Sequence, residues 1–365
     1  MRWYLTYFGA LLLWICTTAL HIPDGYLSPL TSLIMFLLVL PFWAAGLRKI
    51  GASRNSRNVP LVAVMAAFCF VIMMFNVPLP GGTSGHAAGA ALAGIILGPE
   101  TAAVAVSIAL IIQALFFGDG GILAIGANCF NIAVVVPFVA AAIYRSVAKD
   151  TPLTSRRRPL GAAVGGWLGL TIAALLTGVE FGIQPLLFHS ADGAPLYAPY
   201  SLGVAIPAMV IPHALAASVV EGLLSALVIA YLQRSNLQVL EAAEDTDIAR
   251  RAAGPARLRW LWTALAVLIV ASPLGLLAPG TAWGEWGTAE LSRLGLQSIP
   301  AGLDKLSGIW GAPLADYVVP GLGSTSLGYV LSAMLGVVVV GVLTWLFLTL
   351  LTRNGPIAPR DLPPQ

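Results

Sequence analysis

The chain has 365 residues, of which 58% are hydrophobic and only 10% are charged, and its mean hydropathy is +0.87. Soluble domains carry about 25% charged residues, so this composition excludes an ordinary water-soluble globular protein. The net charge of +3 is too small to indicate a nucleic-acid partner. The three cysteines lie singly in apolar runs without CxxC spacing, which favours buried small side chains over a disulfide framework or a thiolate metal site.

Apolar runs long enough to cross a lipid bilayer recur along the whole chain. They predict an all-α fold, a polytopic membrane helical bundle with about seven helices in its core and two more near the C-terminus. In chain order, the predicted spans are 3–19, 29–47, 59–77, 86–99, 101–117, 121–144, 160–181, 203–232, 259–278 and 326–351.

The basic residues test this map. Threading the spans alternately through a membrane places 16 of the 19 basic residues, in four inter-span or terminal segments, on one side together with Arg2. Only Arg293 and Lys305 fall on the opposite side. Because basic loops stay in the cytoplasm, we expect a cell-membrane (inner-membrane) protein whose less basic face points outside.

The first span permits two interpretations. Arg2, the apolar run 3–15 and the small residues Thr17-Thr18-Ala19 resemble a signal peptide that is cut after Ala19. The alternative is an uncleaved first transmembrane helix. The pattern favours cleavage of residues 1–19, which would make Leu20 the first residue of the mature chain.

The remaining chain divides into three predicted parts. Residues 20–234 form the transmembrane core, and the polar run 235–258 reads as a cytoplasmic linker. Residues 259–365 form a second module of helix, external loop and helix, and its loop is rich in Gly, Pro and Trp.

All four histidines fall at or near the predicted external face: His21, His86, His189 and His213. Imidazole is a common ligand of nickel, cobalt, copper and zinc. Glycines and prolines surround His21 and His86, which suggests irregular backbone at membrane depth. Such backbone is tolerated where it is buried in protein or lines a cavity. For His189 we expect only a hydrogen-bonded position near the lipid headgroups.

Cleavage after Ala19 would create a chelate. The free amine of Leu20, the amide nitrogen of His21 and the His21 imidazole can bind one ion through fused rings, and His86 could fill the fourth position. Four nitrogens in a plane suit Ni²⁺ or Cu²⁺. Binding would release protons from the amide and from any protonated imidazole.

Several other polar residues are candidates to support these ligands. Glu221 is a carboxylate inside an apolar span, and we favour a structural polar network over direct ligation. Asn128 and Asn131 are spaced to share one helix face and could orient the ligands. Ser84 and His213 are further supporting candidates, whereas Asp119 reads as a turn residue.

Four segments together resemble a known family: HIPDGYLSP, GGTSGHAAGAALAGIILGP, FFGDGGILAIGANCFNIA and IPHALAASVVEGLLSALVIAYL. They are similar to the nickel/cobalt substrate-binding subunit, called CbiM or NikM, of energy-coupling factor transporters. The resemblance covers about residues 20–232. It implies metal binding by the mature terminus, at Leu20 and His21, together with His86. Many relatives have Met where this chain has Leu20, but only the backbone of that residue would bind.

The resemblance also implies partners. The chain contains no nucleotide-binding motif, so transport would draw on a membrane coupling subunit and two cytosolic ATPase subunits. The C-terminal module resembles the small two-helix accessory subunit of the same transporters, here fused to the core. We expect no resident cofactor, with Ni²⁺ or Co²⁺ as the transported ligand.

Two other functions fit the sequence less well. Gly82-Thr83-Ser84-Gly85 matches the GxSG motif of rhomboid intramembrane proteases, with His213 as a base, but this four-residue match is weak in a chain with 38 glycines. A secondary cation transporter is disfavoured because such proteins need intramembrane carboxylates, which are nearly absent from the predicted spans.

Overall fold

The structure is a computed structural model that describes residues 20–52, 59–79, 83–235, 237–244, 259–277, 284–293 and 298–353. The proposed signal peptide, residues 1–19, lies outside the described residues. Within the described ranges the regular secondary structure is helical apart from one short hairpin, and the prediction of an all-α polytopic membrane bundle is confirmed. Six described helical segments are long and apolar enough to cross a bilayer: Pro29–Gly51, Pro99–Phe117, Ile125–Ala148, Arg157–Leu187, Leu202–Ser235 and Thr325–Thr352.

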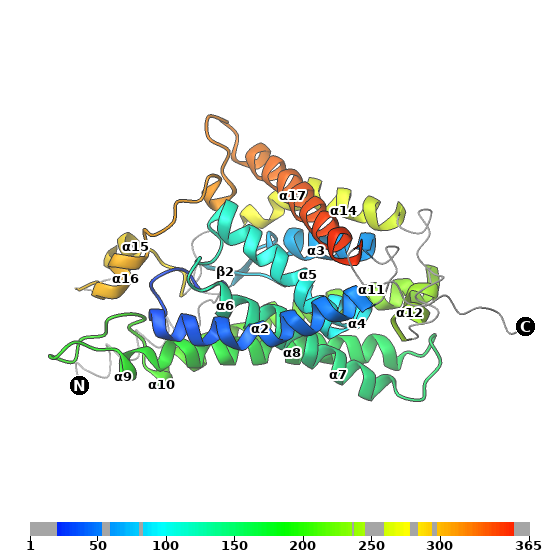
Figure 1. The fold of residues 1–365 in the computed structure, drawn as a ribbon, viewed down its shortest axis with the longest axis horizontal. Coiled ribbons are helices and arrows are strands. Elements are labelled where there is room, and N and C mark those ends of the chain that lie inside the picture. Colours follow the sequence, from blue (N-terminus) through cyan, green and yellow to red (C-terminus); the bar gives the residue numbers. More distant parts are fainter. Residues whose placement is uncertain are drawn as a thin grey trace, which may run out of the picture.

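The core is built from the elements that precede residue 236. They are α2 (Pro29–Ala52), α3 (Val59–Met73), β1 (Val77–Leu79), β2 (Thr83–Gly85), α4 (Ala90–Leu97), α5 (Pro99–Ile112), η1 (Gln113–Phe117), α6 (Ile125–Asn128), η2 (Cys129–Val135), α7 (Val136–Ala148), α8 (Arg157–Gly182), α9 (Gln184–Leu187), α10 (Leu202–Pro212), η3 (His213–Ala217) and α11 (Ser218–Ser235). Helices α7 and α8 pack against each other, and Figure 1 shows them along one side of the molecule.

Local sequence explains where several of these elements begin or change. The Ser28 hydroxyl accepts the backbone N–H of Thr31 at 3.1 Å, which caps the start of α2. Prolines interrupt two long spans, at Pro137 and Pro212, and next to each lies a stretch of π-helix, η2 and η3. Proline removes one backbone donor, and π-helical turns are a common way to accommodate the resulting mismatch.

The predicted span 86–99 is wrong in its extent. The helix there, α4, has only eight residues, which correspond to about 12 Å at 1.5 Å per residue and cannot cross a bilayer. Gly89 precedes it with a φ of 67°, a left-handed conformation that stops the helix from extending back to His86. The segment before it forms the antiparallel pair β1–β2, in which Pro78 is opposite Ser84.

Small residues allow the core helices to approach closely. A Cβ on Gly165 of α8 would lie 2.8 Å from the carbonyl of Ala140 in α7. A Cβ on Gly222 of α11 would lie 2.5 Å from the carbonyl of Ala163 in α8. In a bilayer, where apolar burial gives no driving force between helices, such close backbone packing is a main source of association.

The C-terminal unit packs on α3 rather than standing apart. It comprises α14 (Arg259–Ala271), η5 (Ser272–Leu277), α15 (Thr288–Arg293), α16 (Ala301–Leu306), η6 (Ala315–Tyr317) and α17 (Thr325–Arg353). The Tyr329 hydroxyl of α17 donates to the carbonyl of Met74, which follows α3, at 2.9 Å. In Figure 1 the chain between α14 and α17 reaches the end of the molecule where α2 begins.

An ion pair and the helix α12 bear on the predicted topology and on the predicted linker. Lys49 near the end of α2 pairs with Glu100 at the start of α5 at 2.8 Å, so these ends lie on one side, as the alternating map predicts. The first part of the predicted linker is helical, α12 (Leu237–Glu244), and its Leu240 is buried. Residues 245–258 lie outside the described residues. Figure 1 places α12 at the opposite end of the molecule from α15 and α16.

Candidate metal centre

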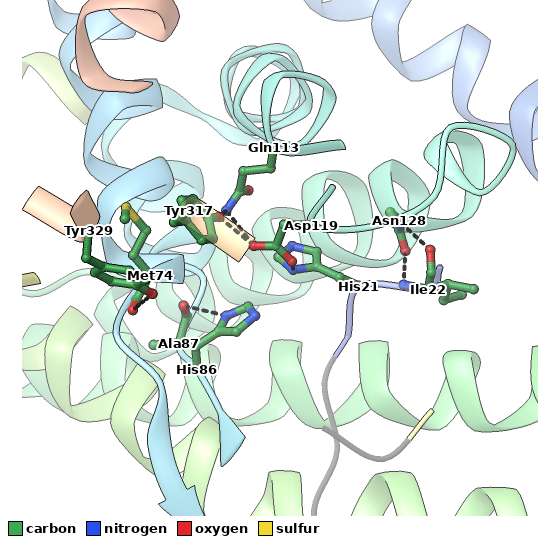
Figure 2. Close-up of polar contacts among 10 residues, drawn as sticks. All are labelled: His21, Ile22, Met74, His86, Ala87, Gln113, Asp119, Asn128, Tyr317 and Tyr329. Carbon is green, nitrogen blue, oxygen red and sulfur yellow. Dashed lines mark hydrogen bonds and ion pairs between the residues drawn. The ribbon is translucent and has the colours of Figure 1, made fainter. Parts of the chain in front are cut away.

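Backbone hydrogen bonds hold the segment after Leu20 inside the bundle. The exposed fractions of Leu20 and His21 are only 2% and 1%. Asn128 binds both backbone groups of Ile22: its Oδ1 accepts the N–H at 2.8 Å and its Nδ2 donates to the carbonyl at 3.1 Å (Figure 2). The N–H of Gly121 donates to the same carbonyl at 2.8 Å. The backbone beside His21 is therefore held in one position.

The loop 118–124 fits closely against this segment. The carboxylate of Asp24 accepts the N–H groups of Ile122 and Leu123 at 2.9 and 2.7 Å. A Cβ on Gly121 would lie 2.3 Å from the backbone nitrogen of Asp24, so only glycine fits there. Sequence analysis did not single out Asp24, although its place in HIPDGYL was a usable signal.

His21 and His86 face one another across this site. Their ring centroids are 4.9 Å apart and the planes are inclined by 32°, although 65 residues separate them in sequence. His86 is 7% exposed, and its Nδ1 lies 3.1 Å from the carbonyl of Ala87. If Nδ1 carries the proton and donates there, Nε2 retains a lone pair for a metal ion. The arrangement is compatible with the predicted ligand pair, whose role stays a prediction.

Glu221 holds the segment that carries His86. Its Oε2 accepts the N–H groups of Ala88 and Gly89, both at 2.8 Å, and its Oε1 accepts that of Ala91 at 2.9 Å. These donors precede or open α4, where no helical partner is available. The side chain therefore belongs to a structural network, which is the role that the sequence favoured.

Asp119 is more than a turn residue. Its Oδ1 lies 2.6 Å from Nδ1 of His21, and its Oδ2 accepts the Tyr317 hydroxyl at 2.6 Å and Nε2 of Gln113 at 3.2 Å (Figure 2). Burial disfavours its ionised form, but the adjacent His21 imidazole outweighs burial and lowers the pKa of Asp119 to about 2. A carboxylate thus lies against the proposed ligand, a role that the GDGG pattern did not indicate.

The C-terminal unit also reaches this site. Tyr317 comes from η6, and its ring stacks on Phe117 with centroids 4.8 Å apart. Glu285, in the chain before α15, places a carboxylate oxygen within 4.8 Å of both a His21 ring nitrogen and an Asp119 oxygen. Burial, and then the charge of Asp119, raise the pKa of Glu285 well above its usual range.

Comparison with known proteins identifies the family. A family model described as "Cobalt uptake substrate-specific transmembrane region", CbiM, matches residues 21–239. The chain belongs to the CbiM family. A second model, the PDGLE domain, matches residues 257–353.

Two relatives and one solved structure agree with this assignment. "Fused nickel transport protein NikMN" of Rhodobacter capsulatus is 49% identical over 335 residues, covering 88% of this chain and 95% of the relative. "Probable fused nickel transport protein LarMN" of Lactiplantibacillus plantarum is 42% identical, with the same shares covered. A crystal structure of a transition metal transporter is similar with a TM-score of 0.55 and 46% identity, covering 66% of this chain and 99% of that one. The chain is thus a multi-pass membrane transport protein and not an enzyme.

The other predicted candidates of this CbiM-family chain lie in several environments. Nδ2 of Asn131 donates to Thr177 and to Glu180, both at 3.0 Å, so it does not contact the His21 segment. The Nδ1 of His213 lies 2.8 Å from the carbonyl of Met209, one turn earlier. His189 is on a loop, beside the carbonyl of Ser190. Ser84 lies in β2, which places its backbone two residues before His86.

Glu180 is a buried carboxylate that sequence analysis missed. It lies near the end of α8, inside the predicted span 160–181, and was obscured by the apolar residues around it. Its partner Asn131 connects it to η2. The statement that intramembrane carboxylates are nearly absent therefore needs correction, since both Glu180 and Glu221 are buried within spans.

Proposed function

We propose that this chain is the substrate-capture subunit of an ATP-driven energy-coupling factor importer for nickel or cobalt ions. The observation that carries the proposal is the close approach of His21 to His86. Hydrogen bonds to Asn128 and to the loop 118–124 hold the backbone of the segment that carries His21. Two imidazoles in a buried position are donors that suit these ions. The relatives named as nickel transport proteins, and the family named for cobalt uptake, point to the same substrates.

The binding set in this proposal is the Leu20 amine, the His21 amide and imidazole, and the His86 imidazole. It requires removal of residues 1–19, since only then is the Leu20 nitrogen an amine. The site would face outside the cell membrane, and energy would come from a membrane coupling subunit and two cytosolic ATPase subunits. A planar set of four nitrogens favours nickel, although cobalt accepts similar donors.

The test is metal titration of the purified protein, with intact mass measured on the same sample. We expect a mass that starts at Leu20 and tight binding of one Ni²⁺ or Co²⁺. His21→Ala should break one chelate ring, because it removes the imidazole and keeps the amide nitrogen, and His86→Ala should open the fourth position. Each substitution should therefore lower the metal affinity by more than about 10–100-fold, which is the loss expected when a residue that only orients a ligand is replaced.

His189→Ala is the matched control, because the His189 ring lies beside the carbonyl of Ser190 on a loop and is not among the clustered potential metal ligands of the described residues. It should bind metal as the parent does. If either His21→Ala or His86→Ala binds with parental affinity, the proposed site is incorrect. If the mass still includes residues 1–19 in protein that binds metal tightly, the amine is not a ligand.

A further inference from the structure

A second set of potential ligands lies beside the nitrogen site. One ring nitrogen of His21, a carboxylate oxygen of Asp119 and a carboxylate oxygen of Glu285 all lie within 4.8 Å of one another. The first two belong to the core, whereas Glu285 belongs to the C-terminal unit. Within the described residues, Nε2 of the buried His21 and Oε1 of Glu285 make no hydrogen bond. Buried polar atoms without partners are rare in native proteins and call for an explanation such as a missing ion.

The three groups differ in their access to solvent. The His21 side chain is 1% exposed and that of Asp119 is 19% exposed. Glu285 is partly exposed as a residue, whereas its Oε1 is buried. An ion arriving from outside would therefore meet the Asp119 carboxylate before it meets the His21 imidazole.

We propose that His21, Asp119 and Glu285 form a loading site, at which an incoming divalent transition-metal ion binds before it moves to the nitrogen chelate. This inference rests on the proposed function. The loading site offers two oxygens and one nitrogen, a mixed set that suits partly hydrated divalent ions. His21 belongs to both sites, so the ion changes partners around one imidazole instead of crossing a gap.

Contacts between the core and the C-terminal unit hold Glu285 and Asp119 in place. The Tyr26 hydroxyl donates to the carbonyl of Trp286, next to Glu285, at 2.8 Å. The Tyr317 hydroxyl donates to Asp119 at 2.6 Å. Glu285 also accepts the backbone N–H of His21. The C-terminal unit therefore supplies one ligand of the loading site and positions another.

The experiment compares Glu285→Gln with Asp304→Asn in the whole chain. Gln keeps an oxygen that can accept the His21 N–H but cannot ionise to a carboxylate when a metal ion binds. Asp304 lies exposed on α16 of the same C-terminal unit, so its replacement makes the same change from carboxyl to amide outside the loading site. Stopped-flow absorbance would follow Ni²⁺ association and dissociation. Mn²⁺ is the second probe, because carboxylate-containing sites accept it whereas a four-nitrogen plane favours nickel strongly over it.

Glu285→Gln should slow Ni²⁺ association on the order of 10-fold, because an amide cannot give up a proton to become a carboxylate ligand as the ion arrives, with a smaller change in dissociation. Mn²⁺ should slow Ni²⁺ association in the parent and in Asp304→Asn, but not in Glu285→Gln. Mn²⁺ binding measured directly by electron paramagnetic resonance should show the same dependence on Glu285. Glu285→Asp should recover part of both effects.

Parental association in Glu285→Gln would overturn the loading site. Slower association with Mn²⁺ inhibition intact would also overturn it, because Glu285 would then act only on structure. A parent that binds neither Ni²⁺ nor Co²⁺ tightly would refute the proposed function instead. The Mn²⁺ measurement would in that case still decide whether the three-group site exists.

Discussion

Asn128 shows how a single amide can position a metal ligand that it does not touch. It satisfies both backbone groups of Ile22, the residue next to His21, and it does so from a helix more than 100 residues away. A buried backbone pair that loses such a partner costs about 1–3 kcal/mol for each unsatisfied group. The position of the His21 amide and imidazole therefore depends on this side chain.

Asn128→Ala should weaken nickel or cobalt binding on the order of 10–100-fold, as expected for loss of an outer-shell partner. Asn131→Ala is the matched control, because Asn131 lies three residues along and bonds to Thr177 and Glu180 instead. Calorimetric titration of both variants would check this. Equal losses in the two would indicate a general effect on folding and not a specific effect on the His21 segment.

At the scale of an element, His86 is positioned by the hairpin before it and by the short helix α4 after it. The sequence pattern predicted one span from 86 to 99, but the apolar run contains four residues, His86 to Gly89, that are not helical. Their backbone groups must find partners inside the bundle. Glu221, from α11, supplies them by accepting three N–H groups.

Glu221→Gln should weaken metal binding on the order of 10–100-fold and destabilise the chain. An amide has a single acceptor oxygen, and its NH₂ group would face a backbone donor, which leaves that donor unsatisfied. The matched control is Ser225→Ala on the next turn of α11, since Ser225 is buried but its hydroxyl makes no hydrogen bond within the described residues. Titration and thermal melting in detergent would check both. Parental binding by Glu221→Gln would show that the network does not support His86.

At the scale of the whole molecule, α17 fixes the C-terminal unit against the core. A Cβ on Gly336 would lie 2.0 Å from the ring of Phe70 in α3, so the two helices touch through this glycine. The Ser332 hydroxyl, one turn earlier, donates to the carbonyl of Tyr317 at 2.8 Å. Packing of α17 is therefore connected, through Tyr317, to Asp119 at the metal centre.

Gly336→Leu should force α17 away from α3, with an overpacking cost of about 1–3 kcal/mol. We expect a lower melting temperature in detergent. Gly341→Leu is the control on the same helix, because no described atom lies within 4 Å of a Cβ added there. A melting temperature unchanged in Gly336→Leu, or lowered equally in Gly341→Leu, would contradict this packing.

The sequence alone determined the membrane class, most of the spans and the two central histidines. Those properties depend on local composition: long apolar runs need a bilayer, and basic loops stay on one side of it. His21 and His86 could be selected because the chain has only four histidines and these two lie in glycine- and proline-rich breaks. The sequence predicted that Glu221 has polar partners but not which ones, because a carboxylate inside an apolar span needs partners.

The tertiary structure decided which distant groups meet. Asp119 is a turn residue locally, and only the fold brings it to His21. Asn128 and Asn131 are alike in sequence, yet Asn128 at the end of α6 binds Ile22, whereas Asn131 in η2 binds Glu180 of α8. Glu285 and Tyr317 reach the centre from a unit more than 260 residues away from His21. Such contacts depend on the paths of whole helices, and no local pattern of residues encodes them.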